Sequence, residues 1–272
     1  MRLPIFQHPS LTVLVDDSEA FLARLQRELG DAIATRAFGD PQAALEWMRE
    51  QAGIGNPKAP AVVVVDQRMA AMTGVGFCAA LASHPCRKIL LTGAGDERAA
   101  IDAFNRGVID RAICKSDDDA LDQLADAIAA LRDEYFLALS DATVPPHALG
   151  DYGFLADPAV ARLVRKVSAA HGVVEHYLHA APCGLMLMDA AGGERLLAIE
   201  TDGGMQSHHE VARDSGAPPS LLDALDARCI VPWFRNGDGM YDESVGERWH
   251  RYCEPARVCE GAQRYYWALF ET

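Results

Sequence analysis

Apolar and polar residues follow two different periods along the first half of the chain. Short β-branched runs alternate with stretches whose apolar residues recur every three or four positions, which is typical of alternating strands and helices around a parallel sheet. The four valines at 62–65 predict a central strand that is buried on both faces. Five strands are predicted, at 11–15, 32–38, 61–65, 88–92 and 110–114.

Five helices are expected between and after these strands. Ser18 is placed to cap a helix whose residues Phe21, Leu25 and Leu29 share one face, and Gly30 ends it. The other helices are expected to begin at Asp40-Pro41 and to cover 74–81, 96–104 and about 118–137. This alternation predicts an α/β fold, a (βα)5 doubly wound parallel-sheet domain, over residues 1–137.

The periodicity is lost over residues 138–150, where a Pro-Pro pair and a glycine predict a linker. Residues 151–272 are expected to form a smaller α+β domain, in an order that weakly resembles PAS-like sensory modules. Its predicted helices are 157–169, 173–180, 207–212, 219–226 and 241–253, and its predicted strands are two around the Gly-Gly turn in 184–200, then 229–234 and 263–270.

Length and composition agree with two globular domains. The chain has 272 residues, of which 50% are apolar, and no apolar run approaches the roughly 20 residues that cross a bilayer. The N-terminus lacks the apolar region of a secretory signal, and the seven cysteines form no C-x-x-C pair. A cytoplasmic protein with reduced thiols is therefore expected.

The net charge of -14 is spread evenly along the chain. Residues 1–145 carry 14 Lys and Arg against 21 Asp and Glu, and residues 146–272 carry 11 against 18, so each part has a charge of -7. Neither part has the basic surface that polyanion binding requires. Nucleic acid is therefore not an expected partner.

Charged and hydroxyl side chains stand at the ends of four predicted strands. Asp16-Asp17 follows the first strand, Asp66 the third, Thr92 the fourth and Lys115 the fifth. The carboxyl ends of parallel strands meet at one edge of a sheet, so these groups should lie together. Three carboxylates about 5 Å apart would repel by roughly 3 kcal/mol per pair, so a cation is needed among them. Because every ligand is an oxygen, Mg²⁺ is the expected cofactor.

These residues also carry a family resemblance. Residues 11–137 resemble a response-regulator receiver domain, on the motifs V-L-V-D-D, V-V-V-D-Q-R-M-A-A-M-T-G, L-T-G and I-C-K in that order. The resemblance implies that Asp66 accepts a phosphoryl group from a phosphohistidine. It also implies that Asp16, Asp17, Asp66 and the main-chain carbonyl of Arg68 bind Mg²⁺.

The resemblance further implies that Lys115 pairs with the phosphoryl oxygens and that Thr92 moves toward the phosphate, which biases a two-state surface. Three positions depart from the family pattern. Ala70 and Ser116 stand where proline is usual, so the loop at Lys115 is expected to be set differently. Ala112 replaces the usual aromatic residue, so an atypical output path is expected.

The second domain carries one basic cluster, Arg162, Arg165 and Lys166. If residues 173–180 were a second helix, this segment would have a helix-turn-helix layout, and the protein would be a transcriptional regulator. The charge of -7 and the lack of a second basic stretch favour a solvated helix face instead. No nucleophile elbow or other enzymatic signature occurs, so no activity is indicated beyond self-phosphorylation and autodephosphorylation.

Some residues of this domain are of metal-binding types but lack zinc-site or EF-hand spacing, so solvated or satisfied side chains are expected. They are His171, Glu175 and His179 on one predicted helix face, Asn236, Asp238 and Asp242 in one polar turn, and His250, Cys253 and Cys259.

The sequence therefore predicts a response regulator of a two-component phosphorelay. Its expected partners are a histidine kinase or phosphotransfer protein, a downstream protein and a second copy of the chain, but no membrane. Two alternatives stay open: a transcriptional regulator with a cryptic helix-turn-helix, and a receiver coupled to a ligand sensor or an enzyme.

Overall fold

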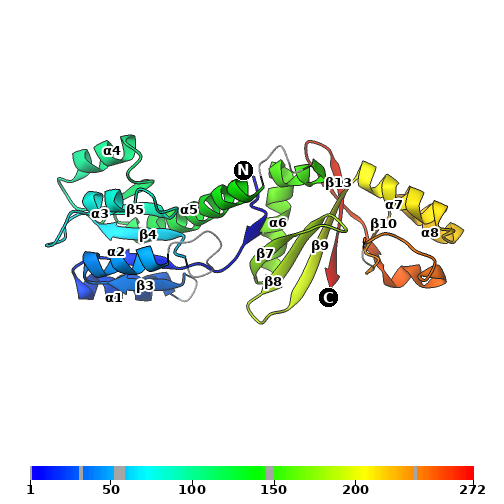
Figure 1. The fold of residues 1–272 in the computed structure, drawn as a ribbon, viewed down its shortest axis with the longest axis horizontal. Coiled ribbons are helices and arrows are strands. Elements are labelled where there is room, and N and C mark those ends of the chain that lie inside the picture. The colour runs from blue at the N-terminus through cyan, green and yellow to red at the C-terminus, as the bar shows by residue number, and fades with distance from the viewer. Residues whose placement is uncertain (1, 31–32, 52–58, 145–149, 236–237) are drawn as a thin grey trace. The chain divides into compact units, whose positions relative to one another are not determined.

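The structure is a computed structural model that describes residues 2–30, 33–51, 59–144, 150–235 and 238–272. It divides into two compact units, which are described separately (Figure 1). One unit is Pro9–Leu139. The other combines the N-terminal segment up to His8 with Ser140–Thr272.

The unit Pro9–Leu139 contains a five-stranded parallel sheet in the order β3-β2-β4-β5-β6. Each neighbouring pair is parallel, and β4 is buried along its whole length. The predicted α/β fold and its central valine strand are therefore confirmed. The strands are β2 (Thr12–Val15), β3 (Thr35–Phe38), β4 (Val62–Asp66), β5 (Arg87–Thr92) and β6 (Arg111–Cys114).

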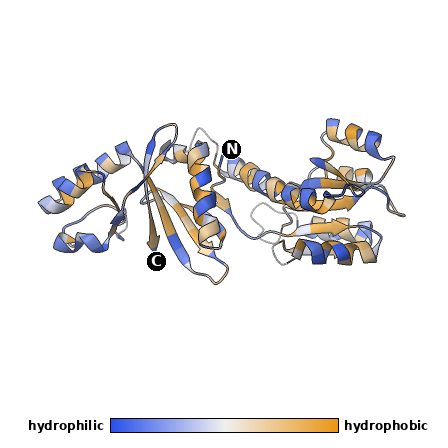
Figure 2. Cartoon of the chain, turned by 180° about the vertical axis from the view of Figure 1, so that it is seen from behind, coloured by the Kyte–Doolittle hydropathy of each residue, from blue (hydrophilic) through white to orange (hydrophobic). Residues whose placement is uncertain are grey.

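Five helices cover this sheet: α1 (Glu19–Leu29), α2 (Pro41–Glu50), α3 (Gly74–Ala80), α4 (Glu97–Asn105) and α5 (Ala120–Thr143). Side chains of α2, α3 and α4 share one core with Val13, Val15, Val63 and Val65. Because strand side chains alternate between faces, α1 and α5 pack on the other face, where Leu25 and Leu124 line the same cavity. Because both faces of the sheet are covered, the first four positions of β4 are all valine (Figure 2).

The second unit is built on a six-stranded antiparallel sheet in the order β1-β7-β8-β9-β13-β12. The strands are β1 (Phe6–Gln7), β7 (Val173–His179), β8 (Gly184–Asp189), β9 (Glu194–Thr201), β12 (Arg257–Glu260) and β13 (Arg264–Glu271). The predicted hairpin around Gly192-Gly193 is β8–β9. A separate antiparallel pair joins β10 (Ile230–Pro232) to β11 (Cys253–Pro255).

Helices cover both faces of this antiparallel sheet. On one face, α6 (Pro158–Ala170) packs on Leu185, Leu187 and Leu197. On the other, α7 (Asp202–Asp214) and α8 (Pro219–Asp226) pack on Leu196 and Ala198. Two short 3-10 helices lie at Gly150–Ala156 and Gly246–Arg251. The predicted α+β character of this unit is confirmed.

The unit boundaries differ from the expected ones at both ends. Phe6 and Gln7 pair with Tyr177 and His176 of β7, so the N-terminal segment belongs to the second unit rather than to the first. At the other boundary, α5 continues to Thr143, so residues 138–143 are helical rather than linker. The rest of the predicted linker lies mostly outside the described residues.

Two secondary-structure predictions in the second unit were wrong, and a third gave too short a helix. Residues 173–180 form β7 instead of a helix, since α6 ends before Gly172, whose φ is 61°, and two β-branched valines follow. The segment 241–253 contains a 3-10 helix and the first residue of β11 instead of one long helix. The predicted helix 207–212 lies within α7, which begins five residues earlier. Without a helix at 173–180, the helix-turn-helix layout does not form.

The seven cysteines are all free, as expected. Burial raises the pKa of Cys78 to about 12 and that of Cys86 to about 11, so these thiols are inert core side chains. Within the described ranges, no helix is long and apolar enough to cross a membrane.

Candidate functional site

The acidic and basic groups at the strand ends of the parallel sheet lie together. The Nζ atom of Lys115, just after β6, is 2.7 Å from Oδ2 of Asp16 and 2.8 Å from Oδ1 of Asp66. Asp16 and Asp66 are 3% and 8% exposed, so the two carboxylates are removed from water. The ammonium group of Lys115 therefore offsets the repulsion between them.

Backbone N–H groups fix how the three carboxylates point. Ser18 N donates to Oδ1 of Asp16 (2.8 Å), and Arg68 N donates to Oδ2 of Asp66 (2.9 Å). Ala70 N donates to Oδ2 of Asp17 at 2.8 Å, although Asp17 itself is exposed. The bond from Ala70 to Asp17 ties the loop after β2 to the loop after β4. The backbone at Ala70 therefore positions a carboxylate without the usual proline.

A glycine closes the loop that follows β4. Gly74 begins α3, and its N–H donates to the carbonyl of Gln67 (3.0 Å). A Cβ at Gly74 would collide with the carbonyl oxygen of Asp66 and with the Leu90 side chain. Glycine at this position therefore lets α3 start directly against the end of β4.

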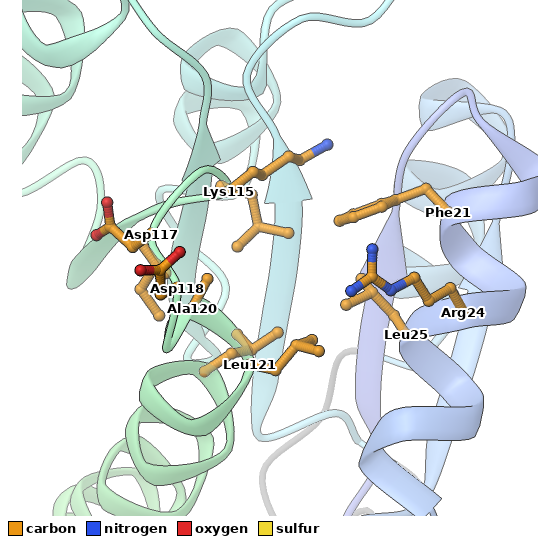
Figure 3. Close-up of a pocket in the computed structure, with 11 residues that line it drawn as sticks. Phe21, Arg24, Leu25, Lys115, Asp117, Asp118, Ala120 and Leu121 are labelled. Atoms are coloured by element: carbon orange, nitrogen blue, oxygen red, sulfur yellow. The ribbon is translucent and has the colours of Figure 1, made fainter.

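Lys115 is positioned by an aromatic ring as well as by the two acids. Its Nζ lies 3.9 Å from the ring centroid of Phe21 in α1, which is a cation–π contact. Figure 3 shows Lys115 extending toward the Phe21 side of a small cavity, of about 90 Å³, between α1 and the start of α5. The periodicity of the sequence indicates for Phe21 only a position on the packing face of α1. No sequence signal pairs it with a lysine 94 residues later.

Thr92 lies at the end of β5 and is buried, at 5% exposed. Its Oγ1 donates to the carbonyl of Ile113 on β6 (3.3 Å). Ala112 pairs with Leu90 and is exposed, so no ring lies beside the threonine at that position. The hydroxyl of Thr92 is therefore held by the backbone of the neighbouring strand.

Arg68 has a side-chain role that sequence reasoning missed. Its Nε lies 3.2 Å from Oδ2 of Asp96, and the same oxygen accepts from Gly93 N (3.1 Å). This ion pair connects the loop after β4 to the residues that precede α4. The sequence holds one hint of the pair between Arg68 and Asp96: each residue follows the end of a predicted strand.

The loop at Lys115 keeps a regular backbone with Ser116 in place of proline. Lys115 N donates to the carbonyl of Thr92 (2.8 Å), and Ser116 Oγ lies 3.0 Å from Sγ of Cys114. In the described part of the chain the one cis peptide bond is Ala181–Pro182. Serine therefore still lets Lys115 reach both aspartates.

The residues of metal-binding types in the second unit do not lie together in one site. Asp238 and Asp242 each accept a backbone N–H two residues later, as in ordinary polar turns, and Asn236 lies outside the described residues. Cys253 and Cys259 lie on different strands. Across the ranges that the structure describes, no three His, Cys, Asp or Glu side chains form a ready metal site. His171, Glu175 and His179 do not share a helix face, because β7 contains the last two.

Comparison with known proteins agrees with this geometry. Residues 12–126 match the family model of the response regulator receiver domain. The whole chain is similar to the structure of the Legionella pneumophila response regulator LqsR, with 29% identity and a TM-score of 0.89 over 100% of this chain and 91% of that chain. No curated protein sequence matches.

Two further solved structures match about half of the chain. One is the adenylate cyclase from Rhodopirellula baltica, with 25% identity and a TM-score of 0.43 over 50% of this chain and 96% of that chain. The other is a response regulator receiver domain protein from Clostridium thermocellum, with 21% identity and a TM-score of 0.42 over 47% and 98% of the two chains.

Residues 12–126 of the parallel-sheet unit thus form a response-regulator receiver domain. A receiver domain supports a role in two-component signal transduction, and it implies a histidine kinase or phosphotransfer protein as a partner. Receiver domains generally use Mg²⁺ for phosphorylation.

Proposed function

We propose that this protein accepts a phosphoryl group on Asp66 in a Mg²⁺-dependent reaction and passes the signal on through protein contacts of its second unit. The observation that carries this proposal is the position of Lys115, whose Nζ binds both Asp16 and Asp66. An ammonium group at this place neutralises charge on an attacking carboxylate and on the oxygens of an incoming phosphoryl group.

The ligands and the charge of the site suit a magnesium ion. Three carboxylates and one ammonium leave a charge of -2, which a divalent cation balances. Asp16, Asp17, Asp66 and the main-chain carbonyl of Arg68 would hold the ion through oxygen atoms. Since Asp17 is exposed, the remaining ligands would be waters, as Mg²⁺ prefers. When bound, the ion draws charge from the phosphoryl oxygens.

The proposed reaction transfers one phosphoryl group from a phosphohistidine. A carboxylate oxygen of Asp66 attacks phosphorus, an O–P bond forms, and the P–N bond to imidazole breaks. The imidazole keeps the electron pair and takes a proton from water, while Lys115 stays beside the new acyl phosphate. Thr92 would then exchange its bond to the Ile113 carbonyl for a phosphoryl oxygen.

Phosphorylation by a small donor tests the proposal directly. Wild type, Asp66→Asn and Asp40→Asn are incubated with MgCl2 and acetyl phosphate and followed by intact mass. Asp40 is a suitable control, because it is an exposed acid that caps α2 and asparagine caps equally well. We expect one added phosphoryl group on wild type and Asp40→Asn and none on Asp66→Asn. Equal modification of Asp66→Asn would place the acceptor elsewhere.

The second unit is proposed to act on a protein rather than on DNA. Its 18 acidic residues exceed its 11 basic ones over residues 146–272, and the segment after α6 is a strand. Electrophoretic mobility shifts at several salt concentrations test this choice. Tight binding that weakens steeply with salt would contradict it.

A further inference from the structure

A cavity of about 710 Å³ in the second unit takes no part in the function proposed above. It lies where β9 ends and α7 begins, and residues 180–183 form part of its wall. Its volume is in the range of small-molecule sites. The side chains that line it indicate what kind of molecule it accepts.

Two buried polar side chains form one wall of this cavity. Glu200 and His208 are 6% and 4% exposed, and Nε2 of His208 lies 3.5 Å from Oε1 of Glu200. The carboxylate rests against the first turn of α7, where a Cβ at Gly204 would collide with its Oε2. Glycine at 204 therefore makes room for the carboxylate.

The carboxylate of Glu200 is the acceptor that this wall offers. Nε2 of His208 lies beside it, whereas Nδ1 of the same ring is buried away from the cavity surface. The carboxylate can therefore accept from a molecule that brings N–H groups.

The other charged residue that lines the cavity is also negative. Asp238 also lines the cavity, whereas the described lining residues include no lysine or arginine. Negative walls without a protein cation attract a cationic ligand. The apolar part of the lining, which includes Pro182, Ile199 and Met240, suits a hydrocarbon group. We infer that this cavity binds a small organic cation, an amidinium or ammonium compound, through N–H donors to the carboxylate of Glu200.

Benzamidine is the probe, and benzamide is its neutral analogue of the same shape. Binding to the full chain is followed by NMR through the backbone amides of Gly203 and Gly204. We expect saturable shifts with benzamidine and none with benzamide. Glu200→Gln should weaken benzamidine binding by about thirtyfold or more, because it removes the charge and one acceptor.

Glu210→Gln is the matched control. It removes the same charge from α7, the helix beside Glu200, but Glu210 is exposed and contacts Gln206 instead of the cavity. Affinity should stay within about twofold of wild type, as expected for an exposed charge. Equal binding of benzamide, or equal losses in Glu200→Gln and Glu210→Gln, would overturn the inference.

A measurement on wild type decides the matter if Glu200→Gln does not fold. Absence of saturable shifts with benzamidine, or shifts of equal size with benzamide, would contradict the proposal. Asp66→Asn should bind like wild type, so this test is independent of phosphorylation.

Discussion

Replacing Lys115 by methionine tests how the carboxylates of the receiver site are held. The substitution keeps an unbranched side chain as far as Cε but removes Nζ and with it the charge between Asp16 and Asp66. Their oxygens are no more than about 5.5 Å apart, the sum of the two distances to Nζ. At an effective dielectric constant of about 20, two such charges repel by roughly 3 kcal/mol.

Amide hydrogen exchange of Val63–Val65 reports the free energy of unfolding of the receiver domain alone, since these residues form its central strand. In EDTA, Lys115→Met should exchange about a hundredfold faster than wild type, which corresponds to roughly 3 kcal/mol. With saturating MgCl2 the difference should fall below about 1 kcal/mol, because a bound cation replaces the lost charge.

Lys166→Met is the control, because it is the same substitution at an exposed position of α6 in the other unit. It should leave exchange of Val63–Val65 unchanged. If Lys115→Met exchanged like wild type in EDTA, the two carboxylates would not repel as calculated. If MgCl2 did not restore its stability, the cation would not bind among these oxygens.

Three further predictions concern individual side chains. Phe21→Ala should reduce the stability of the receiver domain by about 1 kcal/mol beyond the loss of packing and should slow phosphorylation by acetyl phosphate, because Lys115 loses its cation–π contact; a rate equal to that of wild type would contradict this. Gly74→Ala should lower the free energy of unfolding by about 2 kcal/mol, measured by urea denaturation, because its Cβ would collide with the backbone of Asp66. Burial lowers the pKa of His176 from its ordinary value of 6.5, so the unfolded chain binds this proton more tightly than the folded one. The second unit should therefore lose stability as the pH falls below about 6.5, and His176→Gln should reduce this dependence in urea titrations at several pH values.

The receiver domain was predictable because local and long-range signals agree in it. The valines of β4, the cap at Ser18 and the acids at the strand ends each indicate the same fold, and the parallel sheet then fixes which groups meet. The structure agrees on all five strands. The contact of Phe21 with Lys115 and the ion pair of Arg68 with Asp96 could not be predicted from the sequence, because they depend on side-chain rotamers and on loop geometry.

The second unit was less predictable because its sheet is assembled from distant segments. Phe6 and Gln7 make a strand only because β7 lies beside them, and 169 residues separate Gln7 from its partner His176. A two-residue segment carries no periodicity of its own. The order of apolar and polar residues in β7 is also compatible with a short helix. Only the two valines at its start favour a strand.

The two polar sites of this protein contrast in how their charges are compensated. In the receiver site, each oxygen of Asp16 and Asp66 has a donor from Lys115 or from the backbone, and three carboxylates stand against one ammonium group. In the described part of the second unit, the carboxylate of Glu200 has one ion-pair partner, the imidazole of His208 at 3.5 Å. Burial of a charged group lowers stability unless a partner compensates it. The proposed magnesium ion would therefore supply positive charge to the receiver site, whereas the proposed organic cation would supply both charge and N–H donors to Glu200.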